Sequence, residues 1–196
     1  MAINKSNKVV LVVEDEEALR NLYASWLEDE GYQTRLASDG SVALKKWNDK
    51  IDVALVDRRM PDMSGDDLVD QIREKGYHTP ISMVTAVQPQ MDVIELQFDR
   101  YITKPTERLQ FLEVVEDLLK MSEVRSVVRD YVRTGITVHE IQQQHRDGVL
   151  ETHAEFQELN DKLKKLHKQV TENIDNLTKY EEQMLVVARN KVKSVQ

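Results

Sequence analysis

The chain has 196 residues, enough for one domain of ordinary size with an extension or for two small domains. It contains no cysteine, which excludes disulfides and thiolate metal sites. It also contains no apolar run of the ~18 to 20 residues that span a bilayer, so we expect a cytoplasmic protein without a membrane partner. Its formal net charge is −8, with 15 Lys and Arg against 23 Asp and Glu in residues 1–121 and 12 against 12 in residues 122–196, which excludes a strongly basic nucleic-acid-binding chain.

Short apolar runs alternate with amphipathic stretches through the first 121 residues, a pattern typical of an α/β fold. In chain order, we predict strands at 8–13, 33–37, 52–56, 81–84 and 100–103, and helices at 16–29, 41–48, 65–74, 89–96 and 107–120. Runs such as VVLVV and VALV are apolar on both faces, as in a parallel sheet that helices cover on both sides. The sequence therefore predicts a doubly wound, five-stranded parallel sheet.

Polar residues follow the predicted strands at the edge where open parallel sheets bind ligands. They are Glu14, Asp15 and Glu16 after the first strand, Asp57 after the third, Thr85 after the fourth and Lys104 after the fifth. Taken singly, each is a common turn, cap or solvated residue. Taken together, these acids, one hydroxyl and one ammonium at a single edge predict a site.

Carboxylates crowded at one edge raise one another's pKa unless a cation lies among them, and Mg²⁺ is the hard cation that carboxylates and phosphate oxygens commonly hold. Asp57 is then placed to attack phosphorus and form an acyl phosphate. The Lys104 ammonium and the Thr85 hydroxyl can stabilise the phosphoryl oxygens. We therefore predict Asp57 as a phosphate acceptor.

The segments VVLVVEDEEALR, VALVDRRMPDMSGDDL, SMVTA and RYITKP resemble the receiver domain of two-component response regulators over residues 6–121. The resemblance implies a flavodoxin-like sheet with strand order 2-1-3-4-5 and a sensor histidine kinase as partner. It also implies that any catalysis is limited to self-phosphorylation from phosphohistidine and autodephosphorylation. The length of the tail and segments such as FDRYITKP further resemble haloarchaeal receivers joined to a helical HalX domain.

The resemblance also assigns roles to individual residues. It implies that Mg²⁺ is bound by Glu14, Asp15, Asp57 and the backbone carbonyl of Arg59. It also implies that Asp57 is the phospho-acceptor and that Lys104 pairs with the phosphoryl group. Finally, it implies that Thr85 and Tyr101 are the switch pair and that the Lys104–Pro105 peptide bond is cis. One departure is the spacing from Thr85 to Lys104, which is shorter than usual in the family. We therefore expect the helix at 89–96 to be short or distorted.

The pattern changes after residue 121, where the 3/4 spacing of apolar residues slips in phase and proline is absent. We place a domain boundary there, with a receiver at 1–121 and a helical interaction domain at 122–196. From Phe156 a coiled-coil-like heptad pattern runs over four heptads. Its positions are Phe156, Leu159, Leu163, Leu166, Val170, Asn173, Leu177, Tyr180, Met184 and Val187.

Two packing arrangements fit this stripe. It can fold back on residues 122–150 or on the receiver, or it can pair with a second chain. Ten heptad positions extend over about 48 Å at 1.5 Å per residue, longer than one face of a small domain. Gly135 and Gly148 also interrupt 122–150 as a helical partner. We therefore predict a homodimer through residues 156–187.

Three functions compete. The favoured hypothesis is a phosphorelay switch in which the helical domain engages an output protein of unknown identity. Direct DNA binding by a transcription regulator is the alternative, which the zero net charge of 122–196 and the absence of a helix-turn-helix pattern disfavour. A phosphatase of the haloacid dehalogenase type needs a second acid two residues after the nucleophile, and that position is Arg59.

Overall fold

A computed structural model describes residues 4–86, 98–146 and 153–172. The chain divides into two compact units, Met1–Ser122 and Glu123–Gln196, which we describe separately. The helix predicted at 89–96 lies outside the described residues, as do Gly148 and the heptad positions from Asn173 onward. Among the described helices, none is both long and apolar enough to cross a bilayer.

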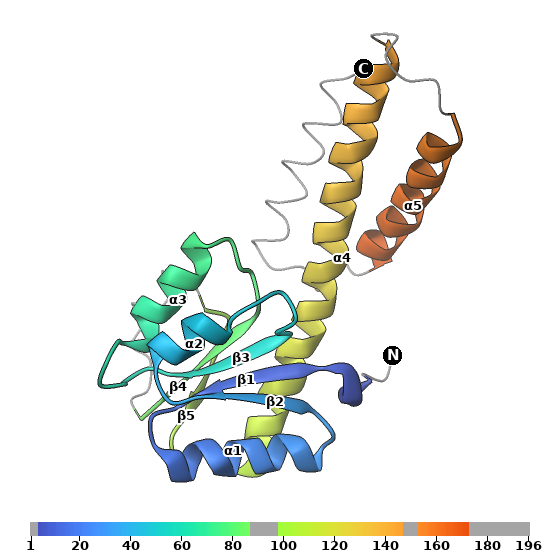
Figure 1. Cartoon of the computed structure of the whole chain (residues 1–196). Helices are drawn as coiled ribbons and strands as arrows, with labels where there is room; N and C mark the ends of the chain where they lie inside the picture. Colours follow the sequence, from blue (N-terminus) through green and yellow to red (C-terminus); the bar gives the residue numbers. More distant parts are fainter. Residues whose placement is uncertain (1–3, 87–97, 147–152, 173–196) are drawn as a thin grey trace. The chain divides into compact units, whose positions relative to one another are not determined.

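The first unit is built on a five-stranded sheet in which every neighbouring pair of strands is parallel (Figure 1). Its strands are β1 Val9–Val13, β2 Gln33–Ala37, β3 Val53–Asp57, β4 Ile81–Thr85 and β5 Arg100–Thr103. The spatial order is β2-β1-β3-β4-β5. Both the doubly wound parallel sheet and the strand order 2-1-3-4-5 are therefore confirmed.

The helices follow the predicted alternation, with one large difference. They are η1 Lys5–Asn7, α1 Glu17–Asp29, α2 Gly40–Lys46, α3 Gly65–Glu74, α4 Arg108–Arg146 and α5 His153–Glu172. The predicted end of a helix at residue 120 is wrong, because α4 continues to Arg146. A phase slip in the apolar stripe changes which face is buried, but it leaves the i to i−4 hydrogen bonds intact.

Helices cover both faces of the sheet, and the strand residues alternate between the two layers. On one face Leu11, Val56 and Met83 pack with residues of α2 and α3, including Leu68 and Ile72. The opposite face packs against α1 and the first turns of α4, and its buried residues include Val10, Leu55, Leu27, Phe111 and Leu118. The apolar runs VVLVV and VALV are apolar throughout because they supply both layers.

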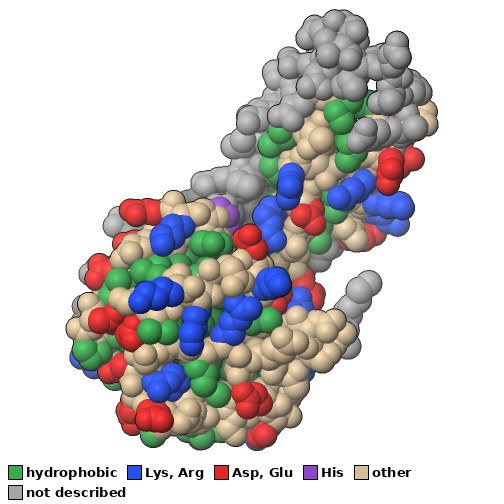
Figure 2. All heavy atoms as spheres, viewed as in Figure 1, with side chains coloured by type: hydrophobic (Ala, Val, Ile, Leu, Met, Phe, Trp, Pro, Cys, Tyr) green, Lys and Arg blue, Asp and Glu red, His purple; other side chains and the backbone are tan. Residues whose placement is uncertain are grey.

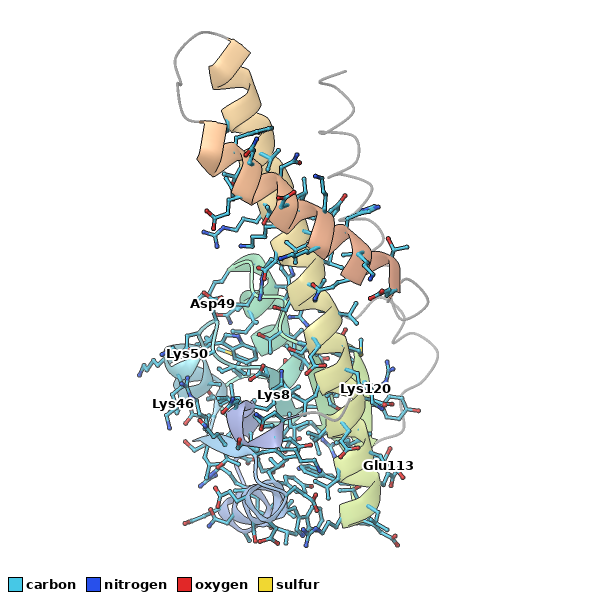
Figure 3. All side chains as sticks on the ribbon, turned by 90° about the vertical axis from the view of Figure 1, so that its right-hand side faces the viewer. Lys8, Lys46, Asp49, Lys50, Glu113 and Lys120 are labelled. Carbon is cyan, nitrogen blue, oxygen red and sulfur yellow. The ribbon has the colours of Figure 1, made fainter. Side chains whose placement is uncertain are left out.

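Two basic side chains, Lys46 of α2 and Arg35 of β2, link the edge strand β2 to α2. Lys46 Nζ donates to the carbonyl oxygen of Leu36 at 2.6 Å, and Arg35 Nη1 donates to the carbonyl oxygen of Lys46 at 3.4 Å. Figure 3 shows Lys46 on this side of the unit, away from Glu113 and Lys120 of α4. Charged residues at a sheet edge disfavour pairing with a strand of another chain.

In the second unit, α5 packs on the later turns of α4. Val124 and Val128 of α4 and Val170 of α5 are buried together, and the rings of Tyr131 and His167 lie 5.6 Å apart. At Val170 the heptad stripe thus packs within the chain, which is one of the two alternatives considered.

Gly135 does not interrupt this helical segment, contrary to our expectation, and lies inside α4. A Cβ at Gly135 would be 3.7 Å from Leu163 Cδ1, so the glycine lies where α5 approaches α4 closely. Packing against α5 offsets the cost of a glycine in a helix interior, which is roughly 1 kcal/mol.

Candidate functional site

Three carboxylates meet at the carboxyl ends of β1 and β3. Glu14 directly follows β1 and is 1% exposed, Asp57 is the last residue of β3 and is 7% exposed, and the neighbouring Asp15 is exposed. Each offers a carboxylate oxygen, and these three oxygens all lie within 4.8 Å of one another. The predicted metal ligands Glu14, Asp15 and Asp57 therefore form one cluster.

Lys104 reaches this cluster from the end of β5. Its Nζ donates to Asp57 Oδ2 at 2.8 Å and to Glu14 Oε1 at 3.0 Å. Glu14 Oε2 is also 2.8 Å from the ammonium, without the geometry of a hydrogen bond. The backbone N–H of Lys104 donates to the carbonyl oxygen of Thr85 at 2.7 Å, which holds the backbone of Lys104 next to the end of β4.

The charged groups of the cluster shift one another's pKa values. Burial raises the pKa of Glu14 to about 7; the nearby Asp57 carboxylate adds to this rise, and the Lys104 ammonium opposes it. For Lys104, burial lowers the pKa, but the hydrogen bonds to Asp57 and Glu14 outweigh it and leave the pKa raised. The ammonium therefore stays charged and neutralises part of the negative charge that burial makes costly.

The two predicted switch residues occupy different environments. Thr85 ends β4 with 3% exposure, one position beyond Val84, which pairs with Asp57. Tyr101 lies on β5 and is 50% exposed. Thr85 is therefore at the level of the acidic cluster on the neighbouring strand, whereas the Tyr101 side chain is at the surface.

Arg59 is linked to the cluster through its backbone. Its N–H donates to Asp57 Oδ1 at 3.1 Å, whereas its side chain is exposed. The loop that carries it is closed by Gly65, whose N–H donates to the carbonyl oxygen of Arg58 at 2.8 Å. The role of the Arg59 carbonyl as a metal ligand stays a prediction.

The chemistry of the donor set fits a hard divalent cation. Carboxylates are the ligands that Mg²⁺ takes from proteins, together with water and phosphate oxygens. Asp15 is exposed to solvent, so bound water can complete the coordination. A cation beside Glu14 would favour its ionised form against the burial that raises its pKa. The Lys104–Pro105 peptide bond is cis, as the resemblance implied.

Two residues that support the site were not identified from the sequence. Arg20 of α1 donates from Nη1 to the carbonyl oxygens of Glu14, at 2.7 Å, and Asp15, at 3.3 Å. Gly65 is the second: a Cβ there would clash with the carbonyl oxygen of Asp57 and lie 2.9 Å from Arg58 Cα. The sequence signal for Gly65 is its place at the start of the helix predicted at 65–74, whereas nothing in the local pattern marks Arg20.

A comparison with family models matches residues 10–116 to the response regulator receiver domain. The chain belongs to the response regulator receiver family. This assignment agrees with the parallel sheet and with the acidic cluster beside a lysine at the carboxyl ends of its strands.

Two relatives of known name each match about three fifths of the chain. A Haloferax volcanii protein whose name describes a transcriptional regulator is 42% identical over 126 residues, which are 64% of this chain and 22% of that protein. The alkaline phosphatase synthesis transcriptional regulatory protein PhoP of Bacillus subtilis is 37% identical over 122 residues, 60% of this chain and 51% of PhoP. The chain thus spans about half or less of these relatives.

Solved receiver structures show the same fold. A CheY-like receiver domain from Methanospirillum hungatei superposes with a TM-score of 0.56 at 29% identity, covering 60% of this chain and 98% of that one. The response regulator TrrA from Thermotoga maritima, solved in complex with Mg²⁺-BeF, gives 0.50 at 33% identity, covering 57% and 99%.

Proposed function

We propose that this receiver accepts a phosphoryl group on Asp57 from a sensor histidine kinase, with Mg²⁺ held by Glu14, Asp15 and Asp57 and by the carbonyl of Arg59. The observation that carries this proposal is the contact of Lys104 Nζ with both Asp57 and Glu14, within an acidic cluster whose oxygens lie inside 4.8 Å. The Mg²⁺-BeF complex of TrrA, a receiver at 33% identity, supports the same cation here.

The residues divide the work of phosphoryl transfer. An oxygen of Asp57 forms the new bond to phosphorus as the phosphorus–nitrogen bond of the kinase phosphohistidine breaks, and the imidazole leaves with the electron pair and takes up a proton. Bound Mg²⁺ would supply positive charge to the phosphoryl oxygens. Lys104 is already within 2.8 Å of Asp57 and pairs with the transferred group, and Thr85 donates its hydroxyl to it.

The output follows from the helical second unit. In this proposal Thr85 and Tyr101 rearrange on phosphorylation and change how residues 123–196 engage an output protein or a second copy of the chain. The names of the Haloferax volcanii relative and of PhoP favour direct DNA binding as a second candidate. Against it, residues 122–196 have no net charge, and on the face in Figure 2 the Lys and Arg side chains lie among Asp and Glu.

The test is labelling by a small phosphodonor such as acetyl phosphate. With Mg²⁺ present, the full chain should gain one acid-stable, base-labile phosphoryl group, which peptide mass spectrometry should locate on Asp57. Removal of Mg²⁺ by chelation, or Asp57→Asn, should abolish the label, because the cation and the nucleophile are then missing. Undiminished labelling of Asp57→Asn would contradict the proposed acceptor.

A further inference from the structure

Asp62 connects the loop that follows the phospho-acceptor to the start of α2. Its carboxylate accepts hydrogen bonds from Gly40 N at 3.3 Å, from Ser41 N at 3.1 Å and from Ser41 Oγ at 3.2 Å. Slight burial acts to raise the pKa of Asp62, but the donors from Ser41 and Gly40 hold it below its usual value. The carboxylate is therefore charged at neutral pH, and such bonds are stronger than neutral ones.

The residue after Asp62 contacts the same place. A Cβ on Gly40 would lie 2.8 Å from Met63 Sδ and 3.2 Å from Met63 Cβ, so Met63 rests directly on the glycine backbone. Earlier in the loop, the Met60 side chain is buried in the core beside α2 and α3. The loop between β3 and α3 is thus fixed at both its middle and its far end.

This loop also carries Arg59. The N–H of Arg59 donates to Asp57 Oδ1, and its carbonyl is the proposed fourth ligand of the cation. Mg²⁺ requires near-ideal octahedral geometry at about 2.0 to 2.1 Å, so a ligand carbonyl on an untethered loop would bind it poorly. Asp62 lies three residues from Arg59 and attaches this stretch to α2 by hydrogen bonds.

We propose that Asp62 is a positioning residue for the metal site: by binding the first N–H groups of α2, it holds the Arg59 carbonyl where the cation needs it. This inference rests on the proposed function, because it concerns the same cation site. It goes further in assigning a role in metal affinity to a residue that does not touch the metal and to which the sequence alone assigned no role.

α2 contains the control that separates this role from simple stabilisation of the helix. Asp39 also caps α2, accepting from Val42 N at 2.7 Å, but it lies before the helix and outside the β3–α3 loop. Asp39→Ala therefore removes a negative charge and a helix cap while leaving the attachment of the loop intact. Asp62→Asn removes the charge of Asp62 but keeps an oxygen that can accept from Gly40 or Ser41.

The experiment titrates Mg²⁺ alone into the full-length parent and the three variants by isothermal calorimetry, with thermal unfolding to show that each is folded at the assay temperature. Asp62→Ala should weaken Mg²⁺ binding roughly 3- to 10-fold, the range expected from one net hydrogen bond. Asp39→Ala should bind within about 2-fold of the parent, since a cap affects helix stability and not the ligand. Asp62→Asn should recover most of the affinity.

Three outcomes overturn the inference: unchanged affinity in Asp62→Ala, an equal loss in Asp39→Ala, or no recovery in Asp62→Asn, which would indicate a long-range charge effect. The proposed function fails differently. In that case the parent itself neither binds Mg²⁺ nor labels at Asp57, and the role of Asp62 falls with it.

Discussion

At the scale of single residues, the site depends on how buried charge is compensated. Glu14 and Asp57 are both nearly inaccessible, and Lys104 is within 3.0 Å of a carboxylate oxygen of each. Two carboxylates buried this closely are costly without a cation, so the lysine and the proposed Mg²⁺ share the task of neutralising them. The two cations have separable roles, because the carboxylates would hold the metal without the lysine, whereas the Lys104 ammonium is proposed to pair with the phosphoryl group.

This difference predicts the effect of Lys104→Ala. The variant should still bind Mg²⁺, because the three carboxylates remain, but it should lose most of the conformational response to acetyl phosphate, because no ammonium pairs with the phosphoryl oxygens. Tryptophan fluorescence or amide NMR, with and without phosphodonor, measures that response. Lys120→Ala is the matched control, since Lys120 is exposed and pairs with Asp117 at the surface. Equal responses in Lys104→Ala and the parent would rule out this role.

Gly65 shows how closely the loop is packed beneath the acceptor. Gly65→Ala should lower the free energy of unfolding of the receiver by about 1 to 3 kcal/mol, because the new methyl group meets the backbone of Asp57 and Arg58, which cannot yield as a flexible side chain would. Urea unfolding followed by circular dichroism measures this, and phosphodonor labelling of Asp57 should slow in parallel. A variant as stable as the parent would show that the backbone can shift freely.

At the scale of elements, the helix from Arg108 to Arg146 is the main surprise. Its first turns cover the sheet through Phe111 and Leu118, and its later turns pack with α5 through Val124 and Val128. Two separate cores are thus contacted by one uninterrupted helix. The phase slip near residue 121 marks the change from one core to the other and not the end of the helix.

The close approach at Gly135 gives a prediction of opposite sign to that at Gly65. Gly135→Ala should raise the stability of the helical unit by up to about 1 kcal/mol, because alanine is the better helix former and its methyl group meets Leu163 at 3.7 Å, an ordinary van der Waals distance. The midpoint of thermal unfolding at 222 nm measures the effect. A lower midpoint would mean that α5 approaches α4 more closely than this distance.

At the scale of the whole molecule, the question is whether the heptad stripe is used within the chain or between chains. Among the described heptad positions, Val170 is buried against α4 of the same chain and Leu163 lies near Gly135 of that helix. The earlier positions Phe156, Leu159, Leu163 and Leu166 are only half-buried. A half-buried apolar stripe has area left for a second copy. The dimer through residues 156–187 therefore stays our prediction.

We expect light scattering to show a dimer of the parent at tens of micromolar, and Leu163→Asp with Leu177→Asp to be monomeric with Asp57 labelling unchanged. Because Leu163 also lies near Gly135, Leu177→Asp alone should be measured beside the pair. Lys165→Asp, on the exposed side of α5, serves as the control for added charge. A monomeric parent would mean that the heptad stripe packs only within its own chain, as an intramolecular hairpin.

The sequence by itself determined the parallel sheet and the residues of the site. Strand runs that are apolar on both faces require a layer of helices on each side, and the carboxyl ends of parallel strands lie at one edge, so Glu14, Asp57 and Lys104 were expected at the same edge. The strand order that brings their strands close together was implied by the family resemblance. The apolar strand pattern repeats along the chain, and the shared edge of the strand ends follows from a parallel sheet. Both can be predicted without knowledge of contacts between distant residues.

Only the tertiary structure decided how these parts are held. Asp62 and Gly40 are far apart in the sequence, and nothing in either local pattern indicates that a carboxylate of one loop binds the first N–H groups of α2. Likewise, Gly135 predicts a helix break by propensity, but packing against Leu163 overrides it. Propensity acts within a few residues, whereas these outcomes depend on which surfaces meet when the chain folds.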